Sequence, residues 1–173
     1  MFLVRTDGPE PRLLMHRHKT FGVLMQVGGH VELDESPWNA VVRELREETG
    51  YDADQVRVLV PPLRCDDLPD DVVHPPPVCL RSIPVSHVPA EHIHTDLAYA
   101  FVTAEPPRHP VGAGESTAIA WLTRGELVGL PTRETYEDAR TLYLFILDRV
   151  CPAWEAVPAS QFSCGLPAGG GGR

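Results

Sequence analysis

Three glutamates that crowd one face of a predicted helix are the residues of this chain best placed to do chemistry. Glu44, Glu47 and Glu48 lie three and four residues apart, so at 3.6 residues per turn their side chains point nearly the same way. Like charges at this spacing destabilise a bare helix by about 0.2–0.5 kcal/mol per pair, and Arg43 alone cannot neutralise three carboxylates. Oxygen-only ligands suit Mg²⁺ or Mn²⁺, so the cluster predicts a divalent-cation site.

The helix that carries these carboxylates is predicted to run from Pro37 to Thr49. The Ser36 side chain can cap free backbone N–H groups, and proline fits the first helical position because no donor is needed there. Gly50 supplies the stop, since glycine accepts the left-handed conformation that commonly ends a helix. An apolar stripe should pack the helix on the core, and its members are Trp38, Ala40, Val41 and Leu45.

A glycine pair lies shortly before this helix and changes how the acidic run is interpreted. The run RELREE, taken alone, suits a solvated helix face. Gly28 and Gly29 add a flexible turn that can bring a backbone carbonyl or amide close to a ligand. Loop and helix together therefore predict one site.

The spacing of these residues resembles the signature of the Nudix hydrolase family. Gly29 is followed by five residues and Glu35, and then by seven residues and the run RELREETGY, which ends at Tyr51. Every invariant position of the signature is filled. Tyr51 stands where the family usually has an aliphatic residue, and Val27 where a proline is common, and neither change removes a chemical group. Chance rarely fills so many fixed positions, so the signal is specific.

The resemblance implies a fold, a cation and a reaction. The fold is of the α/β (α+β) class, a mixed β-sheet between α-helices, covering about Phe2 to Val150. The reaction is cleavage by water of the phosphoric anhydride in a nucleoside diphosphate linked to another group. The implied ligands of Mg²⁺ or Mn²⁺ are Glu44, Glu47, Glu48 and the backbone carbonyl of Gly28 or Gly29.

The resemblance also implies supporting residues and a proton acceptor. Arg43 orients the catalytic carboxylates through salt bridges, and Glu35 helps to brace the loop, as metal sites require of an outer shell. Glu47 or Glu48 accepts the proton of the attacking water. Glu115 is an outside candidate, because some family members use a glutamate from this late loop as a ligand or base. The alternative for Glu115 is a solvated turn residue.

Two groups outside the signature are candidate substrate contacts. His92, His94 and Asp96 alternate along a predicted strand, so they share a face and could meet a phosphate or base at a pocket mouth. A polar strand face explains them equally well. Arg17 belongs to the basic group nearest in sequence to the glycine pair, where ordinary solubilising charge is the alternative explanation.

Two rival functions use the same residues. A catalytically silent sensor or regulator would bind a nucleotide without turnover, but the signature is intact, whereas degenerate members usually lose a glutamate. A Nudix-related isomerase would use similar ligands for proton transfer on a diphosphate, but no cysteine is convincingly placed as its acid or base. Hydrolysis is therefore the preferred interpretation.

Composition and charge narrow the partners. The chain has 173 residues, 43% of them hydrophobic, which is enough for one domain, expected over residues 1–151 with a flexible tail over residues 152–173. The net charge of −9 argues against a nucleic acid polymer, which requires a basic face. A small nucleotide or other diphosphate is the expected partner, and a homodimer is compatible with the sequence.

Patterning along the chain predicts the remaining elements. A long excursion over Pro61 to Pro89 should help to select the substrate. No apolar stretch approaches the roughly 20 residues that cross a bilayer, so we expect a cytoplasmic protein with free cysteines. The predicted strands are Arg12–His16, Val23–Gln26, Val56–Val60, Val78–Val85, His92–Thr103 and Thr117–Thr123, and Arg133–Val150 is a closing helix.

Overall fold

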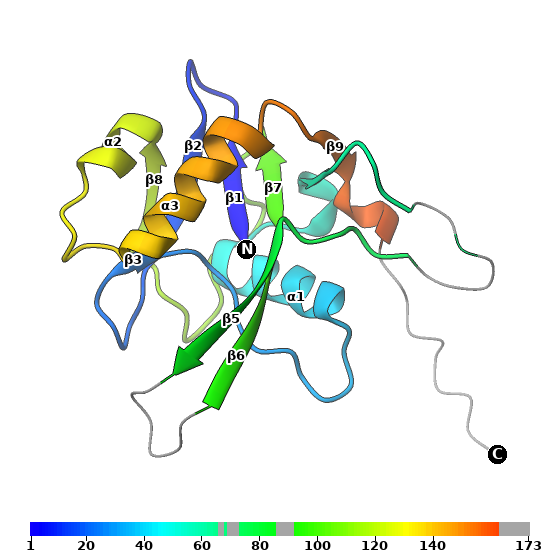
Figure 1. Ribbon diagram of the computed structural model, residues 1–173, viewed down its shortest axis with the longest axis horizontal. Helices are drawn as coiled ribbons and strands as arrows, with labels where there is room; N and C mark the ends of the chain where they lie inside the picture. Colours follow the sequence, from blue (N-terminus) through cyan, green and yellow to red (C-terminus); the bar gives the residue numbers. More distant parts are fainter. Residues whose placement is uncertain (66–67, 69–72, 86–91, 163–173) are drawn as a thin grey trace.

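The computed structural model describes residues 1–65, 68, 73–85 and 92–162, and its elements are shown in Figure 1. The strands are β1 (Phe2–Arg5), β2 (Arg12–Arg17), β3 (Leu24–Met25), β4 (Arg57–Val60), β5 (Cys79–Val85), β6 (His92–Ala98), β7 (Ala100–Thr103), β8 (Ile119–Thr123) and β9 (Glu155–Pro158). The helices are α1 (Pro37–Thr49), α2 (Arg124–Gly129) and α3 (Glu137–Phe145), with short helical turns η1 (Ala53–Gln55), η2 (Ile146–Val150) and η3 (Ala159–Phe162).

Seven of the strands form one mixed sheet. Its order is β3-β2-β1-β7-β4-β9, and β8 pairs with β2. The pair β1 and β7 is parallel, whereas β1 with β2 and β4 with β7 are antiparallel. The predicted fold class, a mixed sheet between helices, is confirmed.

Alternation along the strands fills the two faces of this sheet. In β1, Leu3 belongs to the apolar cluster that contains Trp38 and Leu45 of α1, whereas Val4 belongs to the cluster that contains Tyr143 of α3. Side chains of successive strand residues point to opposite faces, so β1 supplies both cores. The sheet therefore separates α1 from α3, and each helix buries its apolar side against a different face.

Strands β5 and β6 form a separate hairpin, which Figure 1 shows extending away from the main sheet past α1. Leu80 and Ile93 on this hairpin are about two-thirds exposed, at 65% and 66%. The hairpin occupies part of the predicted Pro61 to Pro89 excursion, and β5 confirms the strand expected near Val78–Val85. Residues 66–67, 69–72 and 86–91 of this region lie outside the described residues.

The expectation of a loose tail from residue 152 is wrong for residues 155–162. Strand β9 pairs antiparallel with β4, and Val157 and Ala159 are buried. This segment forms a strand because it pairs with the edge of β4. The alanine and proline content of the segment gave no indication of a strand in the sequence. Residues 163–173, including Cys164, lie outside the described residues, whereas Cys79 and Cys151 are free thiols.

Two predicted elements differ most from the structure. The segment His92–Thr103 divides at Tyr99, because β6 pairs with β5 and β7 pairs with β1 and β4. The closing helix begins at Glu137 rather than Arg133, since the Glu134 carbonyl accepts a hydrogen bond from Leu24 N–H in β3. The short helix α2 was not predicted. None of the helices in the described part of the chain is long and apolar enough to span a bilayer.

Candidate active site

Helix α1 has the bounds that the sequence predicted, and it carries the three glutamates. The Ser36 side chain accepts a hydrogen bond from Asn39 N–H at 3.1 Å, and Gly50 ends the helix with a φ of 77°. The predicted apolar stripe is buried, which fixes the rotation of the helix about its axis. That rotation leaves Glu47 half exposed, with 49% of its side chain accessible, and buries Glu48 to 7%.

Arg43 connects the acidic residues to the loop before the helix. Its Nη1 lies 2.8 Å from Glu44 Oε1 and 3.0 Å from Glu47 Oε2. Its Nη2 donates to Glu35 Oε1 at 2.7 Å and to the His30 carbonyl at 3.1 Å. The guanidinium lowers the pKa of Glu35, and the Glu35, Glu44 and Glu47 carboxylates raise the pKa of Arg43. Arg43 therefore joins Glu44 and Glu47 to Glu35 and to the loop backbone at His30.

Glu48 is the buried carboxylate of the cluster. Its Oε2 accepts a hydrogen bond from the Gly28 N–H, and its Oε1 lies 3.6 Å from His16 Nδ1. Burial raises the pKa of Glu48 to about 7; the Gly28 hydrogen bond opposes this, and the charges of Glu44 and Glu115 add to it. Burial also lowers the pKa of His16 to about 4, with help from the nearby His18. A cation at this position would stabilise the charged form of Glu48 and so offset the cost of its burial.

The glycine pair lets the backbone pass very close to the helix. A Cβ atom on Gly29 would lie 2.0 Å from Glu44 Oε1, which no real contact allows. Gly28 has a φ of 142°, a conformation that residues with a side chain rarely adopt. The conformation of Gly28 therefore favours glycine, and any side chain at position 29 would displace the Glu44 carboxylate, because the loop backbone lies directly against it.

Glu115 approaches the cluster from a loop far along the chain. Its negative charge raises the pKa of Glu48, so the two carboxylates are within electrostatic reach of each other. Gly112 N–H donates to the Glu47 carbonyl at 2.7 Å, and the Ser116 hydroxyl donates to the Arg17 carbonyl at 2.8 Å. These bonds fix the loop on both sides of Glu115. The structure thus places the charge of this outside candidate where it acts on Glu48.

The predicted trio on β6 divides into two parts. His92 Nε2 and His94 Nε2 lie 2.8 Å apart, and the His94 ring meets the His30 ring edge-to-face at 5.7 Å. The Asp96 carboxylate instead accepts a hydrogen bond from Arg81 Nε at 2.8 Å. The two histidines therefore lie beside the residue that follows the glycine pair, whereas Asp96 is engaged in an ion pair within the hairpin.

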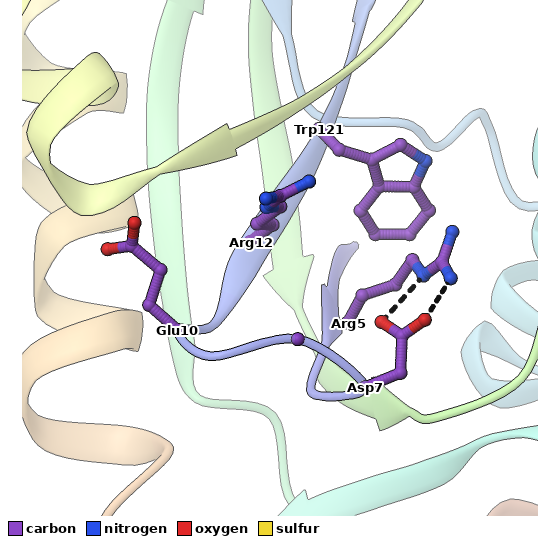
Figure 2. Close-up of a pocket in the computed structure, with 6 residues that line it drawn as sticks. Arg5, Asp7, Glu10, Arg12 and Trp121 are labelled. Atoms are coloured by element: carbon purple, nitrogen blue, oxygen red, sulfur yellow. Dashed lines mark hydrogen bonds and ion pairs between the residues drawn. The ribbon is translucent and has the colours of Figure 1, made fainter.

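Arg17 and a pocket at the other end of β2 lie apart from the cluster. Arg17 Nη2 pairs with Glu134 at 2.8 Å, and no contact among the described residues joins it to the three helix glutamates. Figure 2 shows the pocket, where the Arg5 guanidinium lies 5.3 Å from the centre of the Trp121 ring and pairs with Asp7. Arg12 lines this pocket, four residues along β2 from His16. Trp121 is half-buried against the core that contains α1.

The donor set fits a divalent cation by its chemistry. Four carboxylates and a glycine carbonyl are hard oxygen ligands, and their mutual repulsion is only partly offset by Arg43. Within the described ranges, no three His, Cys, Asp or Glu side chains are already arranged as a metal-binding group. Arg43 and the Gly28 N–H hold the carboxylate oxygens in this conformation. The carboxylates belonging to the set are Glu44, Glu47, Glu48 and Glu115.

Two residues at this site were not singled out from the sequence. His16 is 5% exposed and directly follows the apolar run Leu13–Met15 of β2, and a buried histidine at the end of such a run was the available signal. His30 directly follows the glycine pair, but its neighbour His94 comes from another element. Only the packing of the hairpin against the loop reveals that contact.

Comparison with known proteins gives a consistent result. The family model described as NUDIX domain matches residues 1–145 of the chain. The chain is similar to a hydrolase of the NUDIX family from Clostridium perfringens, at 26% identity with a TM-score of 0.66, over 85% of this chain and 92% of that one. A comparison with curated proteins finds no match.

Two further solved structures share the fold at lower identity. The dihydroneopterin triphosphate pyrophosphohydrolase of E. coli is 17% identical with a TM-score of 0.59, over 88% of this chain and 94% of that one. The Ap4A hydrolase of C. elegans is 14% identical with a TM-score of 0.54, over 83% of this chain and 90% of that one.

Proposed function

Because this chain belongs to the NUDIX domain family, we propose that its carboxylate cluster cleaves the phosphoric anhydride of a nucleoside diphosphate linked to another group, with Mg²⁺ or Mn²⁺ bound. The chain is a pyrophosphohydrolase. The observation that carries the proposal is the close approach of Glu44 and Glu48 to the glycine loop. Arg43 bridges Glu44 and Glu47 in the same cluster.

The cation would be held by residues of α1 and the loop. The ligands would be Glu44, Glu47, Glu48 and the carbonyl of Gly28 or Gly29. When bound, the cation would offset phosphate charge and lower the pKa of a coordinated water. Arg43 would hold Glu44 and Glu47 in one orientation, and Glu35 would keep Arg43 in place, which limits the motion of the set.

A carboxylate of the same cluster would accept the proton from water. Glu47 is half exposed and open to solvent, whereas Glu48 is buried against the glycine loop. The proton acceptor is therefore assigned to the pair Glu47 and Glu48. Glu115 would add charge and a further oxygen from the opposite loop. His92 and His94 would meet the part of the substrate beyond the diphosphate.

Purified protein would be incubated with Mg²⁺ and a panel of compounds to test this function. The panel contains nucleoside triphosphates, ADP-ribose, nucleotide sugars, dinucleoside polyphosphates including Ap4A, and dihydroneopterin triphosphate. We expect turnover of at least one compound, and its loss in Glu47→Gln and Glu48→Gln. Glu137→Gln, an exposed carboxylate in the first turn of α3, is the matched control and should remain active.

Three outcomes separate the alternatives. Turnover that survives both Glu47→Gln and Glu48→Gln would show that the chemistry occurs elsewhere. Nucleotide binding without turnover would favour a sensor. A rearranged diphosphate with no anhydride cleavage would favour an isomerase.

A further inference from the structure

His16 is the side chain from the sheet that faces Glu48. We propose that His16 is a positioning residue, which holds Glu48 Oε1 through its Nδ1–H and thereby sets the direction in which Glu48 presents its charge. The inference rests on the proposed function, because Glu48 is placed there among the cation ligands. It concerns the histidine of β2, for which the motif gives no role.

The backbone fixes the position of the His16 ring. His16 pairs with Met25 of β3 and with Ile119 of β8, so hydrogen-bonded strands flank it on both sides. Its side chain is almost fully buried, and Nδ1 is a buried atom without a hydrogen-bond partner. A buried polar atom of this kind is costly unless it is satisfied, and Glu48 Oε1 is 3.6 Å away.

The contact completes the environment of the Glu48 carboxylate. The Gly28 N–H holds Oε2 from the loop, whereas His16 faces Oε1 from the sheet. At 3.6 Å the His16 contact is longer than a hydrogen bond, and a small rotation of either side chain would close it. Such contacts are often long in a site without its ligands and shorten when they bind. With one donor from the loop and one from β2, the Glu48 carboxylate would be held in a single orientation.

Three substitutions separate positioning from simple space-filling. His16→Asn places an amide where Nδ1 was, His16→Gln places one near Nε2, and His16→Leu keeps volume without a donor. The affinity for Mn²⁺ would be measured by the electron paramagnetic resonance of the free ion. We expect about 10–100-fold weaker binding for the leucine and glutamine variants, as is typical for residues behind a metal ligand. The asparagine variant should stay within a few-fold of the natural protein.

Thermal unfolding identifies any variant that fails to fold, and kinetic constants add a second readout. For the folded variants, kcat should fall with Mn²⁺ affinity while KM changes little. Equal losses in His16→Asn and His16→Leu would overturn the proposal. Full retention in His16→Leu, or better retention in His16→Gln than in His16→Asn, would also overturn it.

A double-mutant cycle tests whether His16 acts through Glu48. In the Glu48→Gln background, His16→Leu should cause no further loss of Mn²⁺ affinity, because the carboxylate it orients is gone. An additive loss would overturn the proposal.

The tautomer of His16 gives a readout that requires neither metal nor activity. Long-range ¹H–¹⁵N correlation spectra of protein with ¹⁵N-labelled histidine should show Nδ1–H at neutral pH. A proton on Nε2, which leaves the Nδ1 lone pair facing the carboxylate, would overturn the proposal. If no panel compound is hydrolysed, the proposed function fails, whereas the tautomer and the Mn²⁺ comparison still decide the role of His16.

Discussion

The glycine loop with α1 and the hairpin β5–β6 lie side by side but are built in opposite ways. In the loop and helix, one guanidinium contacts three carboxylates and a carbonyl, and a Cβ atom at Gly29 would not fit. On the hairpin, Leu80 and Ile93 are largely exposed. Its histidines contact the loop through the edge-to-face packing of the His94 and His30 rings.

The difference separates two tasks. Chemistry on an anhydride requires reacting groups held closely in place, which is achieved by crossing contacts from several elements. Choice among substrates can be made by exposed side chains, because they can change without disturbing the core. We therefore expect changes at the loop and helix to reduce kcat, and changes on the hairpin to alter KM.

The largest effect should come from Gly29→Ala. The new methyl group would displace the Glu44 carboxylate. A misplacement of a catalytic group by about 1 Å costs about 100-fold in rate. Steady-state kinetics and Mn²⁺ binding would measure the loss. The matched control is Gly129→Ala in α2, where the added Cβ meets nothing within 4 Å. A Gly29→Ala protein with natural kcat would contradict the close approach of loop and helix.

A smaller loss is expected for Arg43→Lys. Lysine keeps the charge but cannot reach Glu35, Glu44 and Glu47 together, since it lacks the planar fork. We expect kcat to fall about 10–100-fold with a modest change in KM. Arg46→Lys on the same helix is the control, because its side chain is 63% exposed and pairs only with Asp52 at 3.4 Å among the described contacts. Equal effects of the two substitutions would remove the special role of Arg43.

On the hairpin, His94→Ala should raise KM by about 2–10-fold, the value of one ordinary hydrogen bond, with kcat unchanged. Thr95→Ala on the opposite face of β6 is the control and should have no effect. Competition among panel compounds would show whether His94→Ala also changes the preferred substrate. A fall in kcat instead of a rise in KM would erase the distinction between the two regions.

The smallest effect is expected for Ile93→Ser. Its side chain is 66% exposed, so the free energy of unfolding should change by no more than about 0.5 kcal/mol. Leu45→Ala, in the fully buried stripe of α1, should cost about 2–5 kcal/mol. Urea unfolding measures both values. A large loss for Ile93→Ser would show that the exposed face of the hairpin is packed in solution.

Local signals in the sequence were sufficient for α1 and its carboxylates. The cap at Ser36, the apolar stripe and the stop at Gly50 all act within a few residues, so the predicted and observed bounds agree. Strand β9 and the break at Tyr99 were missed for a shared reason. Both depend on which strand edge is available for pairing, and nothing in the local sequence reports that.

The sequence by itself determined which groups this protein has for chemistry and how they are spaced along one helix, because helical periodicity and glycine conformation are local properties. Only the tertiary structure decided that Glu48 is the buried carboxylate, and that His16 and the Gly28 N–H face its two oxygens. It also decided that the charge of Glu115, on another loop, acts on Glu48. These groups are distant in the chain and meet only because α1 packs on the sheet through its apolar stripe.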